Sequence, residues 1–236
     1  PLFVFIDPFG ATGNPFSLVS DILRSPKSEV LINFDADAVA RILRAGKSAN
    51  SEMILTAIYG DESWREIELD ADSFGDQYRR AVSIYENRLR SLPNVKYVFS
   101  FQMGHTAGSL DYYLVFASQH KMGLVKMKEA MQALDQTGQY QFFDAHVGQH
   151  RLFRFNHPDD FAPKLYQRFQ GRRVTYKETE EYALTDTPFV NPKKMLAILE
   201  DQRLLDVEST NPKRRRGTFN EETIVSLSFR TGDTHG

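Results

Sequence analysis

Residues 2–34 read LFVFI-DPFGATGNP-FSLVSDILR-SPKS-EVLINF. The first block, residues 2–6, is an uninterrupted apolar run, which is typical of a buried strand in a parallel sheet, and the last block, residues 29–34, is a second short, mostly apolar strand. Between them, Asn14 and Pro15 can begin a helix, and apolar residues then follow at helical spacing until the next proline. The stretch therefore predicts a strand, a helix and a second strand, which form a parallel β-α-β unit.

The same alternation of strands and helices continues downstream. Apolar spacing predicts helices over residues 35–46, 54–58, 78–92 and 122–134, and strands over residues 96–103 and 111–118. The two strands are separated by a short polar segment, which predicts an antiparallel hairpin. A mostly parallel sheet with a terminal hairpin is typical of the C-terminal half of the Rossmann-like α/β sheet of class I methyltransferases. Because residues 2–6 then form a buried central strand, we expect further strands upstream of them.

The chain divides into two predicted domains. Residues 135–157 show no clear period and predict a linker, so we place a partial α/β domain at residues 1–150 and a second domain at residues 151–236. The second domain shows three helical segments, residues 159–169, 175–184 and 191–204, and then two strands, residues 205–208 and 223–229. Three helices followed by a hairpin with a basic tip are the winged helix-turn-helix pattern.

The composition is ordinary for a globular protein. The 236 residues are 41% hydrophobic and 25% charged, with a net charge of -2, so bulk charge does not predict a nucleic-acid partner. The absence of cysteine excludes disulfides and thiolate metal sites. No apolar run approaches the roughly 18–20 residues that span a bilayer, and no signal peptide is visible. We therefore expect a cytoplasmic protein with no membrane partner.

The turn after the first strand is one candidate site. Asp7-Pro8-Phe9-Gly10 lies where a parallel strand ends and a helix begins, which is where open α/β sheets bind ligands. In amino-methyltransferases an acidic-Pro-aromatic loop at this place accepts hydrogen bonds from the target amino group and stacks on the base. Here the motif is DPFG rather than DPPY, and Phe9 comes one position earlier than that aromatic. We expect Asp7 to face a ligand; the alternative is a turn shaped by Pro8 and Gly10 for packing.

Two other patterns predict little chemistry. The glycines of residues 10–13 lack both GxGxxG spacing and a Walker lysine, so we interpret them as a turn rather than a cofactor loop. His146 and His150 are four residues apart, but they lie in the predicted linker, and we expect no metal site there.

Three carboxylates leave a third reaction class open. Asp7 follows the first predicted strand, and Asp35 and Asp37 follow the second. Side chains at neighbouring strand ends could converge on metal ions for nuclease-type phosphoryl transfer. No nuclease motif accompanies them, so this interpretation ranks below the others.

The second domain carries clustered cations. Lys213, Arg214, Arg215 and Arg216 stand at the predicted hairpin tip, where they could contact phosphates and release counterions. The third helix is the one that enters the major groove in helix-turn-helix proteins. Further cations stand before this helix and at its start: Arg172, Arg173, Lys193 and Lys194. We expect these eight residues to contact nucleic acid; the alternative is a solvated tip on a protein-binding domain.

Six blocks of sequence carry a resemblance to a known family. They are VFIDPFGATGNPFSLVSDILRSPKSEVLINF, GDESWREI, DYYLVFASQHKMGLVKMKEAM, VTYKETEEYALTDTPF, ILEDQRLLDVE and KRRRGTF. In this order, over nearly the whole chain, they resemble the bacterial three-Cys-motif partner proteins, the TcmP family.

The resemblance implies a class I methyltransferase fold that uses S-adenosylmethionine (SAM), with an added winged helix. It also implies a companion protein that carries a three-cysteine motif and resembles radical-SAM proteins. The active-site positions that it carries over are Asp7, Pro8, Phe9 and Gly10. The glycine-rich loop and acidic residue that hold SAM in such folds belong to an upstream half, so most of the cofactor site is missing from this sequence.

Two functions follow as hypotheses. The first is a SAM-dependent methyltransferase that acts on nucleic acid, seen here without its N-terminal cofactor-binding half. In that case Asp7 orients the acceptor, Phe9 stacks on it, and the hairpin tip holds the phosphate backbone. The second is a non-catalytic module that binds DNA or the companion protein in a two-protein bacterial system. The sequence leaves open whether the chain is an enzyme.

Overall fold

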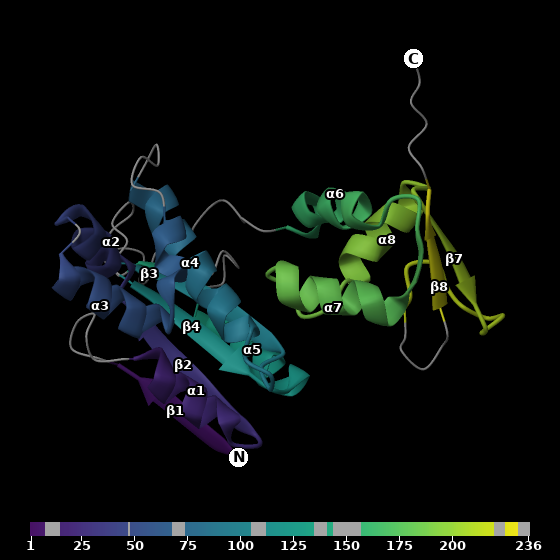
Figure 1. Ribbon diagram of the computed structural model, residues 1–236. Helices are drawn as coiled ribbons and strands as arrows, with labels where there is room; N and C mark the ends of the chain where they lie inside the picture. Colours follow the sequence, from purple (N-terminus) through teal and green to yellow (C-terminus); the bar gives the residue numbers. More distant parts are fainter. Residues whose placement is uncertain are drawn as a thin grey trace. The chain divides into compact units, whose positions relative to one another are not determined.

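The computed structural model describes residues 1–7, 15–46, 48–67, 74–104, 112–134, 141–143, 157–219 and 225–230 (Figure 1). The chain separates into two compact units. The first comprises Pro1–Asp135 and Tyr140–His150, and the second comprises Gln136–Gln139 and Arg151–Gly236. Each unit has its own cluster of buried apolar side chains and its own sheet, so the protein is a mixed α/β structure.

The first unit is built on a five-stranded sheet with the order β1-β2-β4-β3-β5. The strands are β1 (Leu2–Ile6), β2 (Ser28–Phe34), β3 (Tyr97–Gly104), β4 (Tyr112–Ser118) and β5 (Gln141–Phe143). The predicted parallel pairing of the first two strands and the antiparallel pairing of β3 with β4 are both confirmed. Since β4 also runs antiparallel to β2, and β5 runs parallel to β3, β4 opposes the other four described strands.

Helices cover both faces of this sheet. They are α1 (Phe16–Arg24), α2 (Ala36–Arg44), α3 (Ala49–Tyr59), the 3-10 helix η1 (Glu62–Glu66), α4 (Phe74–Arg90) and α5 (Lys121–Leu134). Alternate β2 residues Val30, Ile32 and Phe34 are buried in the core cluster that includes side chains of α1 to α4. On the other face, the Lys128 ammonium of α5 lies 4.1 Å from the centre of the Phe99 ring. Helix α5 therefore packs on the face opposite to α1–α4.

The position of β1 corrects one prediction. Its uncharged run predicts a central strand buried on both sides, but β1 stands at the edge of the described sheet. Leu2, Phe3 and Phe5 are 46%, 53% and 54% exposed, and Ile6 alone in the strand is buried. An apolar run indicates that both faces of a strand favour burial, but it does not determine which neighbouring elements bury them.

A second correction concerns the predicted linker. Within residues 135–157, the structure places β5, which pairs in parallel with β3 from Gln102 to Gly104. A three-residue strand is too short to show a periodic pattern in the sequence. It forms because it can pair with β3, which lies far away in the sequence. The other described residue of the segment is His157, whose side chain caps the next helix.

The second unit has a three-stranded antiparallel sheet with the order β6-β8-β7. Its elements are α6 (Pro158–Phe169), β6 (Arg173–Thr175), α7 (Tyr176–Asp186), α8 (Lys193–Asp201), β7 (Leu205–Ser209) and β8 (Val225–Phe229). The three predicted helices and the terminal hairpin are present, and β6 was not predicted. The core of the second unit contains Leu165 and Phe169 of α6, Leu196 and Leu199 of α8, and Leu227 of β8.

Local capping explains where the helices of this unit begin. Helix α7 begins with a capping box, which the Thr-x-x-Glu sequence favours: Thr175 Oγ1 accepts from the Glu178 N–H at 3.3 Å, and a Glu178 oxygen accepts from the Thr175 N–H at 2.8 Å. At α8, Pro192 is the residue before the helix, and Asn191 Oδ1 accepts from the Lys193 N–H at 3.2 Å. Through the described part of the chain, no helix combines the length and the apolar content that crossing a membrane requires.

Candidate functional site

The eight predicted nucleic-acid contacts all lie in the second unit, at three places. Arg172 and Arg173 stand at the start of β6, and Lys193 and Lys194 form the first turn of α8. Lys213, Arg214, Arg215 and Arg216 lie in the β7–β8 loop, which we define as residues 210–224 and which the structure describes up to residue 219.

Within this loop, Arg214 turns back onto α8. Its two terminal nitrogens each donate to a separate oxygen of Glu200 at 2.8 Å, so the pair is bidentate. The two side chains are only 14% and 12% exposed. The backbone N–H of Gly217 donates to the same carboxylate, also at 2.8 Å. Arg214 therefore holds the loop against the helix instead of facing solvent.

The pair continues into the core of the unit. Arg214 Nε donates to the Thr218 carbonyl at 2.9 Å, and its guanidinium lies 5.0 Å from the centre of the Phe219 ring. Phe219 is buried and stacks on Tyr176, with 6.4 Å between ring centres. Burial by itself raises the pKa of Glu200, but the hydrogen bonds from Arg214 and Gly217 outweigh it, and the pKa lies below its usual value.

Two more of the eight cations pair within the unit. Arg216 donates to the Glu200 carbonyl, and its Nε lies 3.1 Å from an Asp201 oxygen. Arg173 forms an ion pair with Glu208 of β7. Together with Arg214, these residues use their charge to join elements of the fold.

The other predicted cations face solvent. Lys193, Lys194, Lys213 and Arg215 are exposed, and none of them forms an ion pair with a carboxylate of the described residues. Arg172 is exposed too, and it lies against the Phe169 ring at 5.5 Å. Lys193 and Lys194 occupy the positive end of the α8 dipole, where cations reduce helix stability by about 0.3–1 kcal/mol. Such an unfavourable placement favours a role in binding anions.

The strand-end candidate is only partly described. Pro8, Phe9 and Gly10 lie outside the described residues, whereas Asp7 is exposed at the end of β1. Asp7 Oδ1 accepts from Asn33 Nδ2 of β2 at 2.7 Å, so the two strand ends are joined by this bond. Asn33 Oδ1 is buried and has no hydrogen-bond partner among the described residues. The pair thus presents acceptor oxygens and no cation.

The three carboxylates considered for metal binding have separate roles. Asp35 Oδ1 caps α2 by accepting from the Ala38 N–H at 2.7 Å. Asp37 accepts from the Tyr78 hydroxyl at 2.8 Å and pairs with Arg41. The described residues contain no group of three or more His, Asp or Glu side chains that could hold a metal ion. The predicted pair His146 and His150 lies outside the described residues.

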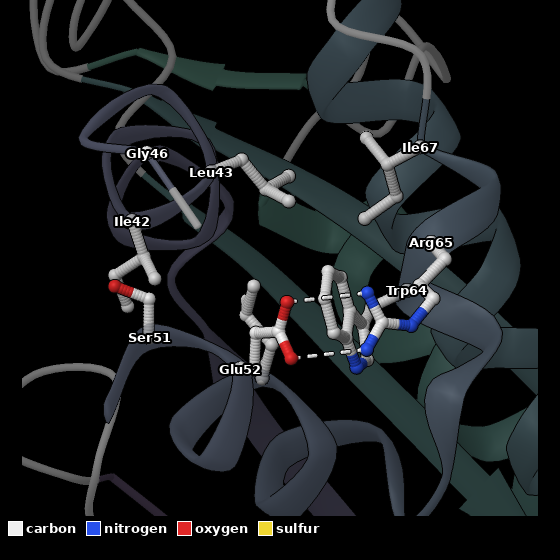
Figure 2. Close-up of a pocket in the computed structure, with 9 residues that line it drawn as sticks. Ile42, Leu43, Gly46, Ser51, Glu52, Trp64, Arg65 and Ile67 are labelled. Carbon is white, nitrogen blue, oxygen red and sulfur yellow. Dashed lines mark hydrogen bonds and ion pairs between the residues drawn. The ribbon is translucent and has the colours of Figure 1, made fainter. Parts of the chain in front are cut away.

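A cavity in the first unit was not predicted from the sequence. It measures about 210 Å³ and lies among α2, α3 and η1 (Figure 2). Nine residues line it: Ile42, Leu43, Gly46, Ser51, Glu52, Leu55, Trp64, Arg65 and Ile67. Trp64 and Ile67 are buried and belong to the apolar core of the unit. The sequence signal that could have drawn attention to it is the only tryptophan of the chain, followed directly by an arginine.

Comparison of the chain with protein-family models, with curated proteins and with solved structures found no match.

Proposed function

We propose that the second unit binds nucleic acid as a winged-helix domain. The order helix-strand-helix-helix-strand-strand, with the last strand between the other two, supports this fold. It makes α8 the helix that enters the major groove and the β7–β8 loop the wing. The observation that carries the proposal is the division of the cations, since Arg214 and Arg216 attach the wing to α8 while Lys213 and Arg215 face outward.

In this proposal the four exposed cations contact phosphates. Lys193 and Lys194 approach the backbone beside the groove that α8 enters, and the α8 N-terminus adds its own positive potential. Lys213 and Arg215 reach the backbone from the wing. Each phosphate contact lowers the slope of log K against log salt by about 0.9 on duplex DNA, so the binding is strongly salt-dependent.

The test is anisotropy of a short labelled duplex at about 50 to about 200 mM salt. Replacing Lys193, Lys194, Lys213 and Arg215 by alanine should weaken binding and flatten the salt slope by about 3 to 4. The matched control replaces four other cations, which are exposed and lie outside the proposed surface: Lys96, Lys126, Lys164 and Arg168. Equal losses in both variants would contradict the proposal. Unchanged binding in the first variant would show that these four cations do not contact the duplex.

For the first unit we propose a methyltransferase-type sheet. The observation that favours it is the single antiparallel strand, β4, which lies between the parallel strands β2 and β3 as in the C-terminal half of class I methyltransferase sheets. The open edge of β1 is where the cofactor-binding half of such a sheet would pair. Asp7, oriented by Asn33, would then accept a hydrogen bond from an amino group at the strand ends.

The residues of this chain do not fit SAM by themselves. The sequence has no GxGxxG turn, and the described strand ends offer Asp7 and Asn33, which bond to each other, and Asp35, which caps α2. The cavity of about 210 Å³ is smaller than the roughly 300–1,000 Å³ of usual ligand pockets. Calorimetric titration of SAM should therefore show no binding to this chain and binding to a form that carries the upstream strands. Binding to this chain alone would contradict the proposed division of the fold.

A further inference from the structure

The cavity of the first unit has apolar walls and a tryptophan at its base. Leu55, Trp64 and Ile67 are at most 4% exposed, so their side chains are fixed by the core around them. Ile42 and Leu43 are half-buried and close the opposite side (Figure 2). Trp64 Nε1 donates to Thr56 Oγ1 at 3.0 Å, which fixes the plane of the indole. The described side chains thus line a preformed apolar space that is open to solvent on one side.

The polar rim of the cavity is equally ordered. Arg65 donates to both oxygens of Glu52, at 3.4 and 3.1 Å, and its Nε donates to Glu62 at 3.1 Å. Its guanidinium lies 4.3 Å from the centre of the Trp64 ring, so the cation is stacked as well as paired. Figure 2 shows the Glu52–Arg65 pair beside the indole at the cavity. Glu52 and Arg65 are the charged residues of the lining, and their charges cancel, while Glu62 holds Arg65 from outside the lining.

Size and charge together define the ligand class. An engineered apolar cavity of about 150 Å³ binds benzene, so about 210 Å³ suffices for one or two fused rings. The indole and the apolar walls suit a flat aromatic face. A carboxylate offers about four acceptor positions, so Glu52 can accept from a ligand N–H while it holds Arg65. Arg65 is already bound to Glu52 and Glu62, so an anionic ligand would have to compete with these two carboxylates.

We propose that this cavity is a binding site for a small, planar nitrogen heterocycle that is uncharged and carries an N–H donor. The rings lie against Trp64 and Leu55, and the N–H donates to Glu52. The site is separate from the strand ends and from the second unit, so it does not depend on the proposed function.

The probe is benzimidazole, and the readout is the indole N–H resonance of Trp64, which is the single tryptophan of the chain. Titration should move this resonance saturably in the full-length protein. 1-Methylbenzimidazole, which lacks the donor, should bind about tenfold or more weakly, as expected for a hydrogen bond to a charged group. Benzimidazole-5-carboxylate should bind more weakly than benzimidazole, because Arg65 is already bound to Glu52 and Glu62 and the ligand carboxylate would lie beside Glu52.

Two variants with the same charge change test the role of Glu52. Glu52→Gln should weaken benzimidazole binding about tenfold or more. Glu62→Gln, which changes the other partner of Arg65 outside the cavity lining, should leave affinity within about twofold. Ile42→Phe, which fills the cavity from its half-buried wall, should abolish binding while the circular dichroism spectrum stays that of the wild type. An unmoved Trp64 resonance, preference for the carboxylate, or equal losses in both glutamate variants would overturn the proposal.

Discussion

Glu200 and Arg214 join the end of α8 to the β7–β8 loop through two parallel hydrogen bonds of 2.8 Å, with both side chains largely buried. A fork of this kind fixes direction as well as distance. Because Gly217 donates to the same carboxylate, Glu200 is the point at which the loop is attached. The first predictions follow from this pair.

Arg214→Ala should lower the free energy of unfolding of the second unit by about 2–3 kcal/mol, because it leaves the Glu200 carboxylate without its partner. Arg215→Ala, the neighbouring substitution at an exposed side chain, should change it by less than about 0.5 kcal/mol. Urea denaturation followed by the amide signals of residues 157–219 distinguishes the two variants. Equal stability losses would show that the ion pair contributes nothing specific.

The same pair makes the unit sensitive to acid. The pKa of Glu200 is lowered in the folded chain, so its contribution is complete above the unfolded pKa, about 4.3, and is lost as pH falls through the folded pKa. The stability difference between wild type and Glu200→Gln should therefore be largest near neutral pH and shrink below about pH 4. Parallel unfolding curves over this range provide the measurement. A difference that stays constant with pH would assign the effect to packing alone.

Arg215→Ala should weaken duplex binding, whereas Arg214→Ala should lower the stability of the second unit. Removing one phosphate contact reduces the salt slope by about 0.9, with little dependence on DNA sequence. The measurement is anisotropy across a salt series, with Lys164→Ala as the control for loss of one charge. A slope identical to that of the wild type would place Arg215 outside the interface.

Two glycines allow a test of close packing in the first unit. Gly60 ends α3 with φ 77°, and a Cβ built there would lie 2.6 Å from Cδ1 of the buried Phe16 ring. Gly60→Ala should therefore cost about 2–4 kcal/mol. Gly46 has a similar positive φ of 97° with nothing within 4 Å of its Cβ position, so Gly46→Ala should cost only about 1 kcal/mol. Thermal unfolding gives the difference, which isolates the steric contribution of Phe16.

The sequence predicted those parts of the fold that depend on local chemistry. The apolar runs before Asp7 and Asp35 form the parallel strands β1 and β2, and Thr175 with Glu178 forms the capping box that a Thr-x-x-Glu sequence favours. The short strands β5 and β6 were not predicted, because their pairing partners lie far away in the sequence. Local pattern carries no information about such partners.

The candidate site was harder to predict for the same reason. In sequence, Lys213, Arg214, Arg215 and Arg216 form one run of positive charge, and nothing in the run separates the paired cations from the exposed ones. Their roles separate only because Glu200 and Asp201 come to lie beside the loop. The cavity likewise needs residues from three elements, and its polar rim depends on Glu52 meeting Arg65 across them.

The exposed strand β1 also affects how the protein behaves at high concentration. Natural edge strands often carry charged residues or proline, which prevent pairing with other molecules. The β1 sequence LFVFI contains neither. Where no upstream strand pairs with β1, this edge should promote self-association, and the aggregates should have cross-β character. A lysine at Phe3, whose side chain is already half in water, would act as a gatekeeper and keep concentrated samples dispersed.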